Sequence, residues 1–235
     1  MFAFALWDAD RRLLFLARDR MGEKPLYYAA TGSALVFGSE LRALLAHPAV
    51  PPELSLDGLN AYLAFEYVPD PLSIIAGVAK LPPGHMLTAS PGRPPRVERY
   101  WDMQFAPDHA VSETEWCQRV VDQLETSVRR RLAADVPVGF FLSGGVDSSA
   151  VVALAARIWG GRTLKTFSMG FAEAGYDERA FARIVARHFG TDHHETIFGA
   201  SDACALLEKG GDLFDEPLGD GSFLPTYALS RLARQ

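Results

Sequence analysis

The chain has 235 residues, of which 49% are hydrophobic and 22% charged, proportions typical of a globular protein with one large domain or two modest ones. Its net charge of −6 argues against a nucleic-acid-binding surface. Cys117 and Cys204 are too few and too isolated for a disulfide framework or a zinc site. There is no apolar run of membrane-spanning length and no basic start of a signal peptide. We therefore expect a cytoplasmic protein that binds neither nucleic acid nor a membrane.

Short apolar runs separated by turn residues predict β-strands in the first part of the chain. These runs lie at 2–7, 13–17, 26–30 and 34–37, and further strands are expected near 85–88 and 96–101. A capping serine predicts a short helix over 39–45, and a second helix is expected to begin at Ser55. The prolines between 69 and 83 break the chain into extended segments.

A long helix and a regular strand–helix alternation are predicted for the second part. Residues 105–111 lack periodicity and are interpreted as a linker, and the helix after it opens at Ser112 or Thr114. Its apolar stripe consists of Val120, Leu124, Val128 and Leu132. Strands are then expected at 136–142, 164–169 and near 193–197, and helices at 148–159, 177–189, 201–213 and 222–234. This alternation predicts a parallel sheet covered on both faces, with ligands bound beyond the carboxyl ends of its strands.

The strongest chemical signal is the segment Leu142-Ser-Gly-Gly-Val-Asp-Ser-Ser149, which follows an apolar strand. Gly144 and Gly145 lack the side chains that would keep backbone N–H groups away from an anion. Ser148 and Ser149 stand at or near the start of the next helix, where free N–H groups and the helix dipole favour negative charge. Asp147 adds a carboxylate suited to Mg²⁺ on a polyphosphate. No Gly-Lys-Ser/Thr follows, so the segment predicts a pyrophosphate loop of a type other than the Walker loop.

Two groups of motifs stand in order along the chain. The first comprises Phe2-Ala-Phe-Ala-Leu-Trp-Asp8, Ala17-Arg-Asp-Arg-Met-Gly-Glu-Lys-Pro-Leu-Tyr-Tyr28 and Phe37-Gly-Ser-Glu-Leu-Arg-Ala-Leu-Leu45. The second comprises the loop, Phe167-Ser-Met-Gly-Phe171, His193-His-Glu195, Asp215-Glu-Pro217 and Pro225-Thr-Tyr227. Together they resemble the glutamine-hydrolysing asparagine synthetases. Residues 1–104 are similar to the later part of the class II glutamine amidotransferase domain, residues 105–111 to a linker, and residues 112–235 to the first part of the ATP-pyrophosphatase domain.

The resemblance implies an α/β fold overall, with a partial β-rich amidotransferase (Ntn-type) layer followed by a parallel-sheet α/β domain. It also implies that glutamine is hydrolysed at an N-terminal cysteine and that its ammonia attacks an aspartyl-adenylate made from ATP. ATP and Mg²⁺ are the implied cofactors, and a homodimer is left open for the whole protein. The implied ATP-binding positions are Leu142, Ser143, Gly144, Gly145, Val146, Asp147, Ser148, Ser149 and Met169, with Asp147 as the Mg²⁺ contact. Four further positions could border the acceptor site: Asp215, Glu216, Asp220 and Ser222.

Each of these positions also has a plainer structural interpretation. A methionine at a strand end is often core packing, Asp147 could be a helix cap, and acids near 215–220 could be solvated loop residues. His193 and His194 have no third ligand at a suitable spacing, so we interpret them as a strand-end pair without a catalytic role. The cluster of Arg18, Asp19, Arg20 and Lys24 is interpreted as a structural polar network.

Two parts of the family machinery are expected outside these residues. The amidotransferase cysteine should stand at the N-terminus, but the first cysteine is Cys117, and the later Ser-Gly-Asp/Glu-Gly motif and the catalytic lysine are absent. We therefore expect an internal segment of a longer protein, with open sheet edges and uncovered apolar faces, that associates and lacks both activities by itself.

Other functions stay open at this point. Residues 67–71 and 80–85 also resemble amidotransferases of exosortase or surface-polysaccharide systems, whose acceptor differs, and β-lactam synthetases and peptide cyclases share the fold. A protein of a different class, a non-catalytic remnant or nucleotide-binding module derived from a decayed synthetase, is also open. The intact loop argues against such decay. An RNA-modifying pyrophosphatase is disfavoured by the acidic balance.

Overall fold

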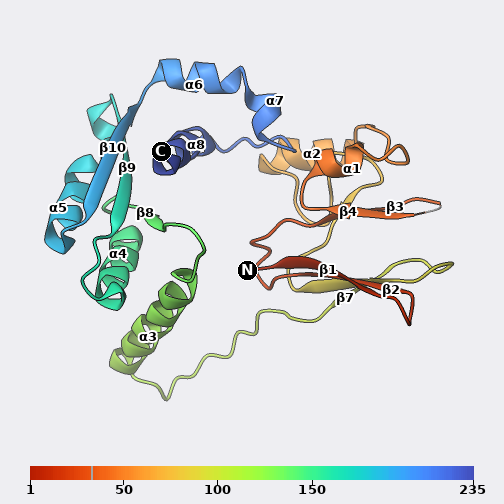
Figure 1. The fold of residues 1–235 in the computed structure, drawn as a ribbon, viewed down its shortest axis with the longest axis horizontal. Helices are drawn as coiled ribbons and strands as arrows, with labels where there is room; N and C mark the ends of the chain where they lie inside the picture. Colours follow the sequence, from red (N-terminus) through yellow and green to blue (C-terminus); the bar gives the residue numbers. More distant parts are fainter. Residues whose placement is uncertain (33) are drawn as a thin grey trace. The chain divides into compact units, whose positions relative to one another are not determined.

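The computed structural model describes residues 1–32 and 34–235, and these residues form two units (Figure 1). Unit 1 comprises residues 1–105 and 209–220, and unit 2 comprises residues 106–208 and 221–235. The chain therefore enters unit 2 after residue 105, returns to unit 1 for twelve residues, and ends in unit 2. The predicted family domains, 1–104 and 112–235 with a linker at 105–111, stay a prediction, because the two units are defined by contacts within the structure and not by family resemblance. No helix of the described residues is long and apolar enough to cross a membrane.

Residues 1–105 of unit 1 contain two antiparallel sheets and the helices α1 and α2, drawn in red to yellow in Figure 1. The larger sheet has the order β1-β2-β6-β7, formed by β1 (Ala3–Asp8), β2 (Leu13–Arg18), β6 (His85–Ala89) and β7 (Arg96–Arg99). The smaller sheet has the order β4-β3-β5, formed by β3 (Tyr27–Ala30), β4 (Leu35–Gly38) and β5 (Ala79–Lys80). The helices are α1 (Leu41–Leu45) and α2 (Leu56–Phe65). The predicted strands and both predicted helices of this part are confirmed.

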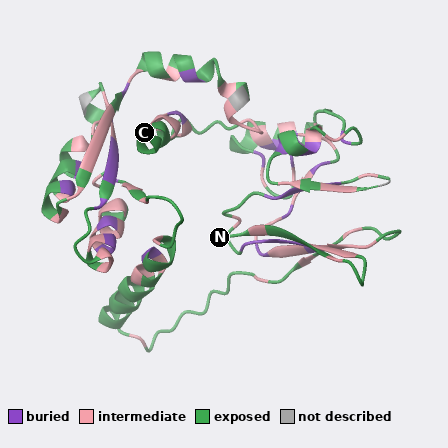
Figure 2. Ribbon diagram, in the orientation of Figure 1, coloured by how far each residue is buried: buried purple, intermediate pink, exposed green. Residues whose placement is uncertain are grey.

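Two apolar clusters hold these layers together (Figure 2). One cluster lies between the two sheets, because Leu16 and Leu87 come from the larger sheet while Leu26 and Leu81 flank strands of the smaller one. The other joins the smaller sheet to the helices and contains Tyr27, Ala29, Leu41, Leu44, Val50, Val68, Ile74 and Val78. Unit 1 is therefore layered as sheet, sheet and helices.

Strand β1 is the edge of the larger sheet and exposes large apolar side chains. The exposed fractions are 43% for Phe4, 55% for Leu6 and 55% for Trp7. An unpaired strand edge bearing such residues favours pairing with another strand. The expected open edge and uncovered apolar surface are therefore present.

Unit 2 is built on a parallel sheet of order β10-β9-β8, in blue to green in Figure 1. Its strands are β8 (Gly139–Phe141), β9 (Lys165–Phe171) and β10 (Asp192–Phe198). Its helices are α3 (Glu113–Arg131), α4 (Val146–Trp159), α5 (Arg179–Phe189), α6 (Ala200–Leu207) and α8 (Phe223–Arg234), with a 3-10 turn at Ala174–Tyr176. The short helix α7 (Gly210–Leu213) belongs to unit 1. The α/β class and the parallel sheet are confirmed, although β8 is shorter than predicted.

The long helix α3 buries only part of its predicted stripe. Val128 is buried in the core of unit 2, and Leu124 and Leu132 pack against that core. Val120, one turn earlier, is 61% exposed, so its predicted place on the buried face is wrong. Val120 lies toward the polar N-terminal half of α3, which extends beyond the core of unit 2.

A buried polar network stands at the end of β2. The carboxylate of Asp19, 4% exposed, accepts four backbone N–H groups at 3.0 to 3.2 Å, from Phe2, Met21, Glu23 and Lys24. Beside it, Arg18 donates to the carbonyl oxygens of Gly22, Lys24 and Leu81 and pairs with Asp70 at 3.2 Å. Each polar atom buried here has a partner, as buried polar groups require. The predicted structural role is confirmed for Arg18 and Asp19, and Lys24 takes part through its backbone.

The variant Asp19→Asn tests how much this network contributes to the free energy of unfolding. Burial raises the pKa of Asp19, but its four backbone donors lower it by more, so the net pKa lies below the ordinary value of 3.8. Asp19→Asn places an NH₂ group among N–H donors, and we expect it to lower the free energy of unfolding by about 1–3 kcal/mol at pH 7. A carboxyl whose pKa is lowered by folding stabilises the fold above its unfolded pKa, and this contribution disappears as the pH falls through the lowered pKa. Urea unfolding should show that the deficit of the variant shrinks near pH 3.

Asp8→Asn is the matched control, because Asp8 accepts only from the exposed Arg11. A deficit of Asp19→Asn that is no larger than that of this control would contradict the assigned role.

The returning segment 209–220 is tied to unit 1 through Glu216. One carboxylate oxygen of Glu216 accepts from the backbone N–H of Ile74 at 2.8 Å. The other pairs with the Lys80 ammonium and lies 3.4 Å from the Tyr27 hydroxyl. The Glu216 and Lys80 side chains are each only 12% exposed. Burial and then the Glu216 charge raise the pKa of Tyr27, which stays a protonated donor.

The same segment supplies both helices of unit 1 with terminal partners. Asp215 accepts from the first N–H of α1, that of Leu41, at 2.6 Å and from Arg42 at 3.2 Å. A carboxylate at a helix N-terminus is favourable because the free N–H groups there are partly positive. At the other end of the segment, the Gly219 N–H donates to the carbonyl of Glu66, the C-cap residue of α2, at 2.7 Å. Unit 1 is thus completed by residues far along the chain.

Glu216→Ala should loosen this segment, because it leaves the buried Lys80 ammonium without its counter-charge. Removal of one partner of a buried pair costs roughly 3 kcal/mol. We expect a lower urea midpoint and faster hydrogen exchange at the Ile74 amide, whose acceptor is lost. The double variant Lys80→Met/Glu216→Leu should recover much of the loss. Glu53→Ala, at an exposed carboxylate of the same unit, is the control, and equal exchange of Ile74 in both single variants would refute the assignment.

Candidate nucleotide-binding site

The loop 142–149 begins where β8 is held in register with β9. The backbone N–H of Leu142 donates to the Phe167 carbonyl at 2.9 Å, and the Ser168 hydroxyl donates to the Leu142 carbonyl. Leu142 itself is 1% exposed. The chain therefore leaves the sheet at a fixed point, at the carboxyl end of β8, and the loop follows immediately (Figure 1).

Gly144 adopts a conformation that only glycine takes without strain. Its φ is +84°, and a Cβ atom there would lie 2.5 Å from the Ala182 backbone nitrogen and 2.6 Å from Phe181. The loop backbone is thus pressed against the first turn of α5. A side chain at 144 would force the loop away from α5.

Two serines brace the loop from within. The Ser143 hydroxyl accepts from the Gly145 N–H at 3.2 Å and lies 3.0 Å from the Ser148 hydroxyl, which in turn donates to the Gly145 carbonyl at 3.2 Å. These bonds fold the loop around the start of α4. The peptide groups at the helix start therefore have a set direction before any ligand binds.

Helix α4 begins at Val146, two residues before the predicted start at Ser148. Asp147, Ser148 and Ser149 consequently lie in its first turn, and no side chain caps this end of the helix. The first N–H groups of a helix have no partner within the helix. With glycine at the cap position, these groups can bind an anion.

Ser149 carries a further indication of a missing ligand. Its hydroxyl is buried and has no hydrogen-bond partner, and it is the one such side-chain atom found among the described residues. A buried polar group without a partner costs on the order of 1–3 kcal/mol. A bound phosphate or water at the helix start would supply the missing bond. Together with the Gly144 conformation, the orphaned hydroxyl fits a phosphate at this loop.

The other predicted ATP-site residues are placed as follows. Met169 lies on β9, opposite Thr196 of β10, two residues before the carboxyl end of its strand. Asp147 is exposed in the first turn of α4. Both lie at the same edge of the parallel sheet as the loop. Their roles toward adenine and Mg²⁺ stay predictions.

The four predicted acceptor-site residues are divided between the units. Asp215 and Glu216 bind groups of unit 1, as described above, and Asp220 is the last residue of that unit. Ser222 precedes α8 in unit 2. Sequence reasoning missed the partners of Asp215 and Glu216, because no local pattern connects them with residues more than a hundred positions earlier. The assignment to an acceptor site stays a prediction.

The histidine pair is engaged in contacts within the sheet of unit 2. His193 bonds Thr166 at 2.8 Å and Glu195 at 3.1 Å, while His194 stacks on Phe167 with ring centroids 5.3 Å apart. Within the described part of the chain, no group of three or more His, Cys, Asp or Glu side chains is placed to hold a metal ion.

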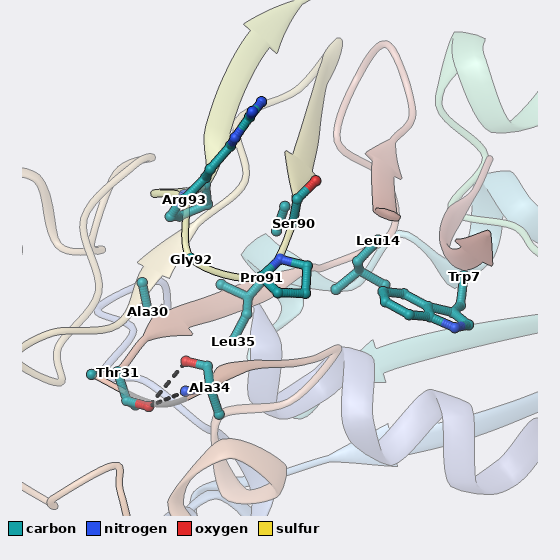
Figure 3. Close-up of a pocket in the computed structure, with 13 residues that line it drawn as sticks. Trp7, Leu14, Ala30, Thr31, Ala34, Leu35, Ser90, Pro91, Gly92 and Arg93 are labelled. Atoms are coloured by element: carbon teal, nitrogen blue, oxygen red, sulfur yellow. Dashed lines mark hydrogen bonds between the residues drawn. The ribbon is translucent and has the colours of Figure 1, made fainter. Parts of the chain in front are cut away.

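A separate pocket of about 610 Å³ lies in unit 1, where turns of the two sheets meet (Figure 3). Trp7 and Leu14 line one side, and residues 30–32, 34–35, 89–93 and 95 line the rest. Arg93 is the one charged side chain among its described lining residues. The pocket contains none of the predicted site residues, and its lining offers no acid–base pair. We therefore place the candidate site at the loop.

Comparisons with known proteins match two family models to successive parts of the chain. A family model described as "Glutamine amidotransferase domain" matches residues 1–101, and one described as "Asparagine synthase" matches residues 119–235. A putative glutamine-hydrolysing asparagine synthetase 2 of Methanocaldococcus jannaschii is 36% identical over 240 residues, which cover 100% of this chain and 46% of the relative. Asparagine synthetase 1 of Bacillus subtilis is 34% identical over 236 residues, which cover 100% of this chain and 37% of the relative.

A third relative has a different name. A protein of Penicillium rubens named Amidase chyE is 37% identical over 210 residues, covering 82% of this chain and 30% of the relative. This chain therefore spans less than half the length of each of these relatives. The two family models, in this order, and the synthetase relatives that match the whole chain lead to one conclusion: the chain belongs to the family of glutamine-hydrolysing asparagine synthetases.

Proposed function

We propose that this chain is part of an enzyme that makes asparagine from aspartate, ATP and glutamine-derived ammonia. Glutamate, AMP and pyrophosphate are the other products. The observation that carries the proposal is the loop 143–149, which leads from the carboxyl end of β8 to the uncapped start of α4 and follows, in the order of the family, the part of the chain that matches the amidotransferase model. Aspartate as the acceptor is inferred from the names of the synthetase relatives.

The chemistry follows from the weakness of a carboxylate as an electrophile. Transfer of AMP from ATP to the carboxylate supplies a good leaving group, and negative charge then builds on the departing pyrophosphate. The uncapped N–H groups of α4 and the unpartnered hydroxyl of Ser149 are donors at the start of this helix, where we expect that charge to develop. Donors oriented in advance stabilise such a transition state most effectively.

Mg²⁺ is part of this proposal through Asp147. This exposed carboxylate in the first turn of α4 lies beside the proposed phosphate position and is a hard oxygen ligand of the kind Mg²⁺ prefers. When bound, Mg²⁺ would neutralise phosphate charge. A cytoplasmic location and a homodimer of the whole protein belong to the proposal as well.

Gly144→Ala tests the loop as the nucleotide site. Because a Cβ at a φ of +84° would lie 2.5 Å from the Ala182 nitrogen, the loop must leave α5. We expect the chain to bind ATP in a calorimetric titration and the variant to bind at least about tenfold more weakly. Gly175→Ala is the matched control in unit 2, since its Cβ would meet no atom within 4 Å. Equal ATP affinity of Gly144→Ala and wild type would refute the loop assignment.

The acceptor is tested with the whole protein that contains this chain. With radiolabelled pyrophosphate, we expect exchange into ATP that depends on aspartate and that other carboxylates do not replace. For residues 1–235 alone we expect no ammonia-dependent AMP release. Exchange driven by a different carboxylate would overturn aspartate as the acceptor, and robust turnover by the isolated chain would overturn the expected inactivity.

A further inference from the structure

The first turn of α5 lies between the loop and the end of β9. On one side, Phe181 and Ala182 approach Gly144 of the loop within 2.6 Å of where a Cβ would stand. On the other side, Arg179 covers Gly170, and a Cβ at 170 would fall 2.1 Å from the Arg179 Nε atom. Gly170 follows Met169, the position predicted to meet adenine. Arg179 thus lies at the carboxyl edge of the sheet, between the proposed positions of phosphate and base.

The Arg179 guanidinium is held on one edge only. Its Nε and Nη2 atoms donate to the Asp177 carboxylate at 2.8 and 2.7 Å, and the backbone N–H of Arg179 also bonds Asp177. This pairing lowers the pKa of Asp177 to about 2. The Arg179 side chain is 19% exposed, and the described residues supply no partner for Nη1. Asp177 therefore fixes the orientation of the guanidinium while its outer edge, Nη1 and Nη2, remains available.

Arg183, one turn later on α5, provides a comparison. It donates through Nε and Nη2 to both oxygens of Glu195 from β10, at 2.8 and 2.6 Å, and its side chain is 50% exposed. Arg179 is paired through the same two atoms but is the more buried of the two, at 19% exposed. Asp177 takes the Nε side of the Arg179 guanidinium and leaves its outer edge available. A guanidinium edge of this kind matches two phosphate oxygens.

We propose that the outer edge of Arg179 binds the α-phosphate of ATP held at the loop, with Asp177 as the residue that positions it. This assignment rests on the proposed function, because it takes the loop as the site of ATP. The α-phosphate is the group between the base and the terminal phosphates, and Arg179 lies between Gly170 and the loop. A fixed positive charge there would favour both nucleotide binding and transfer of the adenylyl group.

The test measures binding of ATP, AMP, magnesium pyrophosphate and adenosine to the 235-residue chain and its Arg179→Met variant. We expect ATP and AMP to bind roughly ten- to a hundredfold more weakly to the variant, and pyrophosphate and adenosine to bind unchanged. Arg179→Lys, which keeps the charge but loses the fork, should give an intermediate loss for AMP. Arg187→Met, on the same helix, is the matched control and should leave the affinities unchanged.

Two further measurements distinguish a lost contact of Arg179 from two other causes of weaker binding. These causes are misfolding of the variant and repulsion by the uncovered Asp177 charge. On the wild-type chain, AMP should protect Arg179 from phenylglyoxal but leave Arg187 reactive. Asp177→Asn/Arg179→Met should bind AMP no better than Arg179→Met, because the lost contact is that of Arg179. Recovery of affinity in the double variant would assign the effect to the uncovered Asp177 charge and overturn the proposal.

The remaining outcomes are also decisive. A loss confined to ATP and pyrophosphate would overturn the α-phosphate assignment, as would equal AMP affinity of wild type and Arg179→Met. Absence of ATP binding by the wild-type chain would overturn the proposed function itself, and with it this contact.

Discussion

The pairing of β8 with β9 is the constraint on which the candidate site depends. Strand β8 is only three residues long, and it is held to β9 by a short ladder that ends in the bond from Leu142 to Phe167. That bond and the Ser168 hydroxyl fix the point where the loop leaves the sheet. The direction of α4 follows, and the contact of Gly144 with α5 then sets the distance between the loop and the end of β9. The donors at the start of α4 are thus anchored to the sheet by this one ladder, while Asp177 orients the guanidinium of Arg179.

Local pattern was sufficient to predict most of the elements and the loop. Alternating or continuous apolar runs predict the strands. The Ser-Gly-Gly segment between a strand and a helix predicts an anion-binding loop, because glycine lacks the side chain that would keep backbone N–H groups away from an anion. Errors arose where tertiary contacts decide. Helix α4 starts at Val146 since Gly145 can serve as its cap, and Val120 is exposed because the core of unit 2 ends before its turn of α3. Periodicity indicates which side of a helix is apolar but does not indicate where its partner ends.

The roles of Asp215 and Glu216 show the limit of sequence reasoning more sharply. The family resemblance implied that these two acids border an acceptor site. In the structure their partners are Leu41, Arg42, Ile74 and Lys80, which are 136 to 174 residues away. No propensity or spacing predicts an ion pair across such a separation. Only the path of the chain, which returns to unit 1 at residue 209, brings the groups together.

This return has a consequence for how the two units depend on each other. Segment 209–220 lies between α6 and α8, both of which belong to unit 2, yet its carboxylates complete α1 and neutralise Lys80 in unit 1. A buried ammonium and an uncapped helix are costly, so these contacts of segment 209–220 add to the stability of unit 1. The N-terminal residues 1–105 alone would leave Lys80 and the start of α1 without these partners. The boundary between an amidotransferase-like and a synthetase-like part, clear in the order of the motifs, therefore does not separate all the interactions that stabilise unit 1, because division of the chain at the linker would remove Asp215 and Glu216 from it.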